Sequence, residues 1–337
     1  PIQSGERTLT RRGERSQSQV TARPDIFVGG RWSAPIDGEV VEVRSPATGQ
    51  VVARAGLGGP ADMDAAVAAA RRSFDSGIWA DADPQERGRV IARAADLLEA
   101  RADELAISIT AELGCPIGFS QRAHVPNPIR HLRYYAQMCA DYAYEQTRTD
   151  GTNTSIVRQV ASGVVAAITP WNGPISTPSL KIGPALAAGC SVVLKPAAET
   201  PITVQAMAQA FAEAGLPEGV LSVVPGGRES GAHLVAHPDV DKIGFTGSTL
   251  AGKAIMAVAS NRIARVTLEL GGKSAAIVLP DADLASVVPA LMPMVLLVNG
   301  QACIAQTRLL VPQSREAEII EAVAAAMRDQ VVGDPMD

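Results

Sequence analysis

Residues 163–195 read GVVAAITPWNGPISTPSLKIGPALAAGCSVVLK, and their pattern indicates the fold class. Two apolar runs, Gly163–Ile168 and Ser191–Lys195, flank a helical stretch, Ser179–Ala188, that ends at Gly189. Short apolar runs rich in valine are typical of strands that are buried on both faces. A strand, a helix and a second strand in this order predict a βαβ unit with parallel strands.

The alternation of strands and helices continues downstream to residue 260. We expect further strands at Val220–Val224 and Lys242–Phe245, and helices at Thr203–Ala214, Ser230–Ala236 and Leu250–Ser260. Parallel strands joined by helices form a sheet that is covered on both faces, as in dinucleotide-binding domains. The sequence therefore predicts an α/β fold with a Rossmann-type parallel sheet.

The first half of the chain has a mixed pattern. Asp25–Trp32 indicates a strand and a turn, and alternating polar and apolar residues predict strands at Val40–Ser45 and Gln50–Ala55. Apolar residues at helical spacing predict helices at Asp62–Phe74, Pro84–Ala111 and Pro128–Tyr144. Thr152–Val160 has β character with polar edges, which indicates an exposed hairpin. Residues 1–23 are polar and carry five arginines, so we expect a flexible tail there.

Composition excludes several classes of protein. The net charge of −5 and the 19% of charged residues argue against nucleic acid as the main partner. Because no apolar run approaches the roughly 20 residues that span a bilayer, we expect no membrane partner. Four cysteines without CxxC spacing are typical of a reducing cytoplasm. His233 and His237 have the spacing of two zinc ligands but lack the Glu of HExxH, so we expect a solvated helix face and no metal.

Several motifs follow the predicted strands directly, where parallel sheets bind their ligands. Thr169–Pro174 reads TPWNGP, Lys195 closes the next strand, and Phe245–Gly252 reads FTGSTLAG. Ser248 or Thr249 can cap the helix that follows, whose free N–H groups would suit a pyrophosphate. Gly227 can let the backbone approach a ligand, although a plain turn is an equal alternative.

A carboxylate and a thiol stand at the two ends of residues 266–308. Glu269 precedes Cys303 by 34 residues, and both lie beside glycine-rich turns. A thiol is a nucleophile once it is ionised, and a nearby carboxylate can act as a base. The amide of Asn172 can donate to a developing oxyanion. The alternative interpretation is a buried structural cysteine and a surface glutamate.

Two motifs in this stretch identify a family resemblance. Glu269–Lys273 reads ELGGK and Gly300–Cys303 reads GQAC, and both resemble the active-site signatures of the aldehyde dehydrogenase superfamily. Three upstream motifs, at Pro170–Asn172, Lys195 and Phe245–Gly252, agree with it. The resemblance implies a dinucleotide-binding domain (24–139 and 160–268), an oligomerisation arm (140–159) and a partial catalytic domain (269–337).

The resemblance also implies a reaction, the oxidation of a small-molecule aldehyde to a carboxylic acid with NAD or NADP. Cys303 would attack the aldehyde, Asn172 and the Cys303 backbone N–H would stabilise the oxyanion, and Glu269 would direct water onto the thioester. Lys181 matches a lysine that is sometimes drawn into proton relay. The implied cofactor-binding residues are Ile168, Thr169, Pro170, Trp171, Lys195, Gly227, Phe245, Gly247, Ser248, Ala251 and Leu270.

The chain departs from the family pattern in three places. Ala198 stands where the family often carries the glutamate that holds the adenosine ribose, and Glu199 follows it, so we expect NAD and leave NADP open. Gly173 replaces an aromatic residue, which predicts a wider channel for bulky or aromatic aldehydes. The resemblance stops within a motif at Val331–Asp337, which indicates C-terminal truncation. The alternative function is therefore a catalytically incomplete fragment that at most binds the dinucleotide, and a homodimer or homotetramer is expected of a full-length chain.

Overall fold

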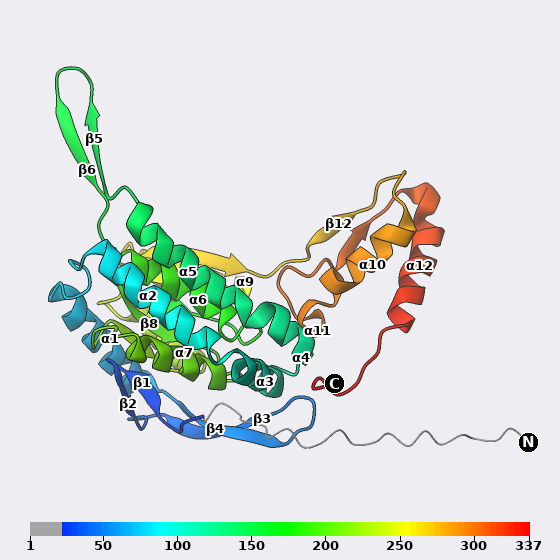
Figure 1. The fold of residues 1–337 in the computed structure, drawn as a ribbon, viewed down its shortest axis with the longest axis horizontal. Coiled ribbons are helices and arrows are strands. Elements are labelled where there is room, and N and C mark those ends of the chain that lie inside the picture. The colour runs from blue at the N-terminus through cyan, green and yellow to red at the C-terminus, as the bar shows by residue number, and fades with distance from the viewer. Residues whose placement is uncertain (1–21) are drawn as a thin grey trace, which may run out of the picture.

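The computed structural model describes residues 22–337, which form a layered α/β body with a smaller C-terminal lobe beside it (Figure 1). The predicted flexible tail covers residues 1–23, so nearly all of it lies outside the described residues. None of the helices within residues 22–337 is long and apolar enough to cross a membrane.

The body is organised around a seven-stranded sheet in the order β11-β10-β7-β8-β9-β1-β2. The strands are β1 (Ile26–Val28), β2 (Arg31–Ser33), β7 (Val164–Ile168), β8 (Ser191–Lys195), β9 (Leu221–Val223), β10 (Lys242–Gly247) and β11 (Arg265–Leu270). Strands β7 to β11 run parallel, whereas β1 joins β9 antiparallel. Every residue of β7 and β8 is buried, which confirms the two-sided burial predicted from their apolar runs.

Helices cover both faces of the sheet. One layer contains α1 (Pro60–Asp75), α8 (Arg228–Ala236) and α9 (Thr249–Ser260), and the other contains α2 (Pro84–Glu99), α5 (Pro126–Asp141), α6 (Ser176–Ala187) and α7 (Ile202–Glu213). Successive residues of β7 face the two layers in turn, as the pleat of a strand requires: Val164 and Ala166 pack with the first layer, and Val165 and Ala167 with the second. The predicted Rossmann-type α/β fold is confirmed.

The prediction of one long helix over 84–111 is wrong, because α2 ends at Glu99 and a separate helix, α3 (Ala102–Leu113), follows it. Arg101 leaves the helical region with φ −110° and ψ 22°, and its guanidinium binds Glu104 in the first turn of α3. Neither Gly nor Pro marks this break. The chain turns here so that α3 can pack on α7 and on β3 (Glu39–Arg44), which is a tertiary cause.

Two antiparallel pairs lie outside the main sheet. β3 pairs with β4 (Val51–Leu57), and β5 (Glu145–Thr149) pairs with β6 (Thr154–Arg158). Figure 1 shows β5 and β6 projecting away from the body, and all ten of their residues are exposed. This confirms the predicted exposed hairpin, although the predicted range, residues 152–160, included only the second of its two strands.

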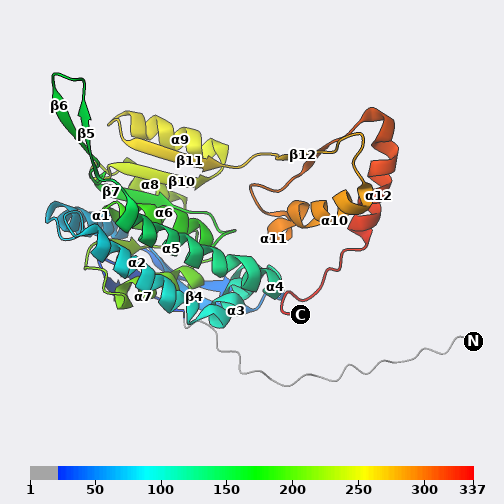
Figure 2. The same ribbon diagram turned by 45° about the horizontal axis from the view of Figure 1, so that its top comes forward.

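The C-terminal lobe contains few strands and much exposed apolar surface. Its elements are β12 (Ala275–Ile277), α10 (Leu284–Val295), α11 (Leu297–Gly300), β13 (Arg308–Leu310), a 3-10 turn (Gln313–Arg315) and α12 (Glu316–Arg328). Figure 2 shows the lobe standing apart from the main sheet, joined to β11 by an extended segment. Ile277 and Ile320 are 70% and 60% exposed. The lobe touches the body again near α4 (Ile117–Phe119), where Ile117 N–H donates to the carbonyl of Pro335 at 2.7 Å.

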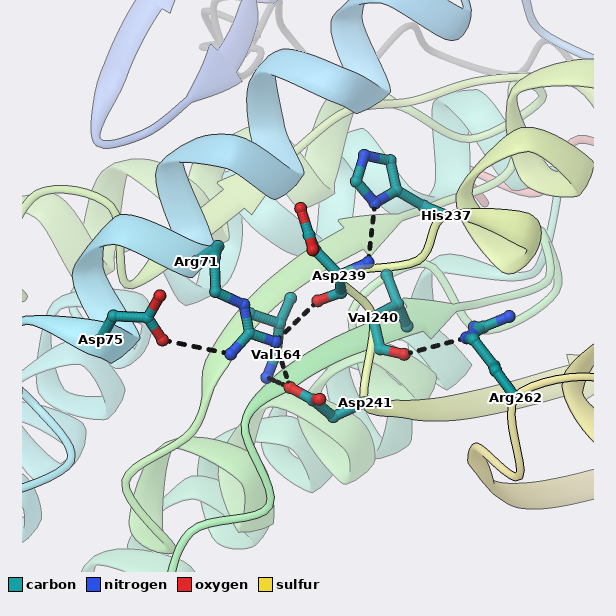
Figure 3. Close-up of polar contacts among 8 residues, drawn as sticks. All are labelled: Arg71, Asp75, Val164, His237, Asp239, Val240, Asp241 and Arg262. Carbon is teal, nitrogen blue, oxygen red and sulfur yellow. Dashed lines mark hydrogen bonds and ion pairs between the residues drawn. The ribbon is translucent and has the colours of Figure 1, made fainter.

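A polar network closes the end of the sheet where β7 and β10 begin (Figure 3). Arg71 of α1 binds the Asp241 carboxylate and donates to the carbonyl of Asp239 at 2.8 Å. The Asp241 carboxylate also accepts the N–H of Val164 at 2.7 Å. These bonds tie α1 to the start of β7 and to the residue before β10. The opposite end of the sheet, where these strands finish, is therefore the end that is free to bind a ligand.

Candidate active site

The order of the strands in the sheet predicts a crevice at the carboxyl ends of β7 and β10. From β7 the chain runs outward through β8 to β9, and then returns to β10 on the other side of β7. Ligands bind parallel sheets of this kind at the carboxyl ends of the strands on either side of such a reversal. A cavity of about 660 Å³ lies there, within the usual size range of ligand sites.

The cavity brings together most of the predicted cofactor-binding residues. Ten of the eleven line it, namely Ile168, Thr169, Pro170, Trp171, Lys195, Gly227, Phe245, Gly247, Ser248 and Ala251. The eleventh, Leu270, is outside the lining and lies at the end of β11, opposite Gly247 of β10. Strand-end motifs that are separated in sequence therefore meet in one hollow.

The segment after β10 shapes one wall of this cavity. Ser248 caps α9, since its side-chain oxygen accepts the N–H of Ala251 at 3.2 Å, so Ser248 and not Thr249 is the N-cap. A Cβ added at Gly247 would lie 2.4 Å from the ring of Phe245, so any other residue at that position would require the ring to move. The first turn of α9 therefore borders the cavity, and an anion there would meet the positive end of the helix.

Lys195 is held by the protein's own backbone. Its ammonium donates to the carbonyl of Pro196 at 3.1 Å and to the carbonyl of Gly226. Burial lowers the pKa of Lys195 to about 8, and the charge of Glu199 raises it in part. An ammonium has three N–H groups, so one remains to meet a ligand in the cavity.

The sequence patterns did not predict several other lining residues. They include Arg228 at the start of α8 and the α9 residues Leu250, Ala254, Ile255 and Val258. The α9 residues recur at helical spacing from Ala251, and this signal could have found them. No sequence pattern marks Arg228 as a lining residue, because it reaches the cavity only through the position of α8 beside β8. Ala198 and Glu199, considered as alternatives for the ribose contact, both line the cavity.

One hydrogen bond connects the cavity wall with the cysteine segment. The side-chain amide of Asn172 donates to the carbonyl of Gln301 at 2.6 Å. Asn172 directly follows Trp171 of the cavity wall, and Gln301 lies two residues before Cys303. The bond joins residues 129 apart in the sequence, so two of the predicted catalytic segments lie side by side.

Cys303 differs from the other three cysteines in its exposure. Cys115, Cys139 and Cys190 are buried, whereas Cys303 is exposed. The exposure of Cys303 contradicts the alternative interpretation as a buried structural cysteine. Burial raises the pKa of the Cys190 thiol, as expected for the core cysteine that the flanking valines predicted.

The backbone before Cys303 adopts an uncommon conformation that the sequence did not predict. Val298 and Asn299 have φ of 52° and 56°, and Gly300 has φ of 76°. Left-handed backbone is costly for a β-branched residue such as valine and is often found at functional sites. The Asn299 side chain donates to the carbonyl of Gly114 at 2.8 Å, which fixes this turn to the end of α3.

Glu269 of β11 and Lys181 of α6 are close enough for their charges to interact. Glu269 is an exposed residue of β11, and Lys181 is a partly buried residue of α6. Burial lowers the pKa of Lys181 to about 8, and the charge of Glu269 opposes that change. Within residues 22–337, no hydrogen bond or ion pair joins either side chain to Cys303. The structure thus brings Asn172 to the Cys303 segment, and Glu269 to Lys181.

The two histidines with zinc-like spacing face an acidic residue. His233 Nε2 lies 2.6 Å from the Asp64 carboxylate, and His237 Nε2 lies 3.6 Å from it. Over the described part of the chain, no group of three or more His, Cys, Asp or Glu residues could hold a metal ion.

These features define an α/β protein of the Rossmann type with an exposed thiol beside its ligand crevice. The family model named "Aldehyde dehydrogenase family" matches residues 32–337. The chain belongs to the aldehyde dehydrogenase family.

Curated relatives extend beyond the length of this chain. The geranial dehydrogenase of Castellaniella defragrans is 44% identical over 313 residues, which are 93% of this chain and 66% of that protein. The 3-succinoylsemialdehyde-pyridine dehydrogenase of Pseudomonas sp is 40% identical over 314 residues, with 93% and 65% covered. The chain therefore spans about two thirds of the length of these relatives.

Solved structures agree with the fold. An aldehyde dehydrogenase of Mycobacterium tuberculosis, complexed with NAD+, has a TM-score of 0.91 and 45% identity over 94% of this chain and 66% of its own. Aldehyde dehydrogenase C of Pseudomonas syringae, in complex with NAD+ and octanal, has a TM-score of 0.88 and 38% identity over 97% and 65%. Both similarities extend over nearly the whole chain, so the aldehyde dehydrogenase fold is established.

Proposed function

We propose that the protein oxidises an aldehyde to a carboxylic acid with a nicotinamide dinucleotide, and that Cys303 is the nucleophile. The hydrogen bond from Asn172 to the carbonyl of Gln301 is the observation that supports this most directly. It holds the only exposed thiol of the described residues beside the wall of a cavity suited to a dinucleotide. Acyl chemistry at a thiol needs this combination of nucleophile and amide donor.

The cavity fits a dinucleotide in its chemistry. A Cβ at Gly227 would meet nothing within 4 Å, so the backbone there borders open space that a ligand can fill. The start of α9 suits a pyrophosphate, and the lysine and threonine side chains at the strand ends suit ribose and phosphate oxygens. The bound cofactor would supply the hydride acceptor. NAD+ in the solved structures of two relatives supports the same choice.

NAD is the cofactor that we propose first. The Glu199 carboxylate lines the cavity and would repel the 2′-phosphate of NADP. Lys195 and Arg228 line the same cavity and carry positive charge, so NADP is the second candidate. Titration of the chain with each dinucleotide decides between them.

The chain's own residues would carry the covalent steps. The Cys303 thiolate would form a bond to the aldehyde carbon, while Asn172 and the Cys303 backbone N–H stabilise the oxyanion. After the hydride has left, the product on sulfur is a thioester. Glu269 would then take a proton from water, whose oxygen attacks the thioester carbon and releases the acid and the thiol. Lys181, beside Glu269, is the proposed proton-relay residue.

Bulky or aromatic aldehydes are the proposed substrates. Gly173 has no side chain beside the proposed oxyanion donor, and a Cβ there would lie 2.7 Å from the Thr177 hydroxyl. That contact shows Thr177 packed against position 173, so the proposal rests on the aromatic side chain that the family pattern places there and that this chain lacks. We expect kcat/KM for a benzaldehyde-sized substrate to exceed that for short aliphatic aldehydes, and the reverse order would contradict this proposal.

A catalytically incomplete protein that only binds the dinucleotide is the second candidate function. Within residues 22–337 no hydrogen bond or ion pair joins Glu269 to Cys303, which favours this candidate, as does the exposed apolar surface of the C-terminal lobe. Exposed strand edges and apolar patches of this kind are normally covered.

One experiment separates the two candidates. NADH formation is measured with the 337-residue chain, NAD and a panel of aldehydes, beside Cys303→Ser, while calorimetry reports NAD binding. Activity that the substitution abolishes supports the dehydrogenase. Binding without turnover supports the incomplete protein, and the absence of binding contradicts both.

We also propose a domain division and an assembly. Residues 24–139 and 160–268 would form the dinucleotide-binding domain, 140–159 the oligomerisation arm and 269–337 part of the catalytic domain. The exposed β5–β6 hairpin supports an arm, since Ile156 of β6 is 67% exposed and Val160, just after the strand, is 77% exposed. A homodimer or homotetramer in the cytoplasm is the expected form of a full-length chain, and light scattering with and without the hairpin tests the assembly.

A further inference from the structure

A buried carboxylate from the first half of the chain reaches the loop that forms one wall of the cavity. Glu112 lies in the last turn of α3 and is only 4% exposed. Its Oε2 accepts the N–H of Ile202 at 2.8 Å, and its Oε1 accepts the N–H of Thr203 at 3.2 Å and the Thr203 hydroxyl. Burying a carboxylate is costly, and these three hydrogen bonds offset part of that cost.

These bonds replace the N-cap that α7 lacks. The helix begins at Ile202, after Pro201, which provides no side-chain capping bond. The first N–H groups of a helix have no partner within it, and a negative charge near them is favourable. A serine or aspartate at position 201 could satisfy them at less cost, but such a cap would move with the loop. Glu112 instead fixes the start of α7 to a different helix.

The start of α7 is also the end of the loop 196–201 that follows β8. Residues 197–199 of this loop line the cavity. The other end of the loop is held at Pro196, whose carbonyl accepts the ammonium of Lys195. The three lining residues therefore lie between two anchors, and Glu112 is one of them.

A hydrogen bond connects this loop to a second wall of the cavity. The Thr200 hydroxyl donates to the carbonyl of Trp171 at 3.0 Å. Trp171 lines the cavity after β7 and is followed by Asn172, the residue that contacts the cysteine segment. A shift at the start of α7 would reach both walls through this bond.

We propose that Glu112 is a positioning residue for the dinucleotide. By holding the start of α7 to α3, it keeps loop 196–201 and the Trp171 segment in the shape that the cofactor fits. This inference rests on the proposed function, because it assumes that the cavity takes NAD.

Two variants and a control test this role in the 337-residue chain. Glu112→Gln keeps the shape of the side chain but removes its charge and one acceptor. Thr203→Val removes only the hydroxyl donor and is the milder variant. Asp241→Asn is the matched control, because that carboxylate also accepts a backbone N–H, from Val164 at 2.7 Å, at the opposite end of the sheet. Calorimetry gives the Kd for NAD, and amide hydrogen exchange reports on residues 196–203.

We expect Glu112→Gln to raise the Kd for NAD about tenfold and Thr203→Val about threefold, with faster exchange in residues 196–203. Asp241→Asn should lower Tm but leave both the Kd and this exchange unchanged. An unchanged Kd or unchanged exchange in Glu112→Gln would overturn the role of Glu112. If the unsubstituted chain does not bind NAD, the proposed function fails with it, whereas binding that is insensitive to Glu112 refutes this inference alone.

Discussion

Glu112 should make the stability of this protein depend on pH in an unusual direction. Burial raises the pKa of Glu112 from 4.5 to about 7, and the bonds from Thr203 and Ile202 only partly oppose that change. Between these two values the folded chain holds a proton at Glu112 that the unfolded chain has lost. The free energy of unfolding therefore falls as pH rises from 4.5 to about 7 and levels off above it.

The magnitude follows from the separation of the two pKa values. Each pH unit between them changes the free energy of unfolding by about 1.4 kcal/mol, so the effect over the range from 4.5 to about 7 is about 3 kcal/mol. Because Glu112 is buried, solvent does not screen this contribution. It amounts to a large fraction of the stability of an ordinary domain, which is about 5–15 kcal/mol.

Urea unfolding at a series of pH values measures this effect when the unsubstituted chain is compared with Glu112→Gln. Glutamine does not titrate, and the other ionisable groups contribute nearly equally to both chains, so their difference isolates Glu112. The unsubstituted chain should lose about 3 kcal/mol relative to the variant as pH rises from 4.5 to about 7. A constant difference would refute the reasoning, and a change of the opposite sign would mean that the three hydrogen bonds outweigh burial.

Three further predictions concern the proposed active site. In the folded chain, iodoacetamide should alkylate Cys303 and leave Cys115, Cys139 and Cys190 unlabelled until urea is added, because only Cys303 is exposed; peptide mass spectrometry checks this, and equal labelling of all four would contradict it. Asn172→Ala should lower kcat by about 10²–10³ with a smaller change in KM, since an oxyanion donor acts in the transition state; a pure KM effect in steady-state kinetics would argue against that role. Ser248→Ala should cost about 1 kcal/mol in urea unfolding, because the N–H of Ala251 loses its cap, and an unchanged midpoint would count against Ser248 as the N-cap.

Predictions from local pattern succeeded where one feature of the chain was enough. The apolar runs of β7 and β8 predicted strands that are buried on both faces, and the structure has every residue of both buried. The motifs at strand ends predicted a common crevice, because parallel strands finish at the same edge of a sheet. Ten of the eleven residues that the family resemblance implies for cofactor binding lie in or near these motifs and line the cavity.

The failures have a common physical cause. The range 84–111 has apolar residues at helical spacing throughout, and only packing of α3 on other elements breaks it at Arg101. Arg228 lines the cavity because α8 starts beside β8, and no local signal marks it. The left-handed turn at Val298 and Asn299 is supported by a bond to Gly114, far away in the sequence.

Local sequence patterns were enough to predict the alternation of strands and helices and the motifs at the strand ends, because side-chain periodicity and turn chemistry act over a few residues. The candidate nucleophile came instead from the resemblance of the GQAC motif to a family signature. Two contacts could be found only in the folded chain: Glu112 caps a helix 90 residues away, and Asn172 donates to a carbonyl 129 residues away. Such contacts depend on how whole layers pack, since the partner of a buried polar group is whatever the fold brings within hydrogen-bonding distance.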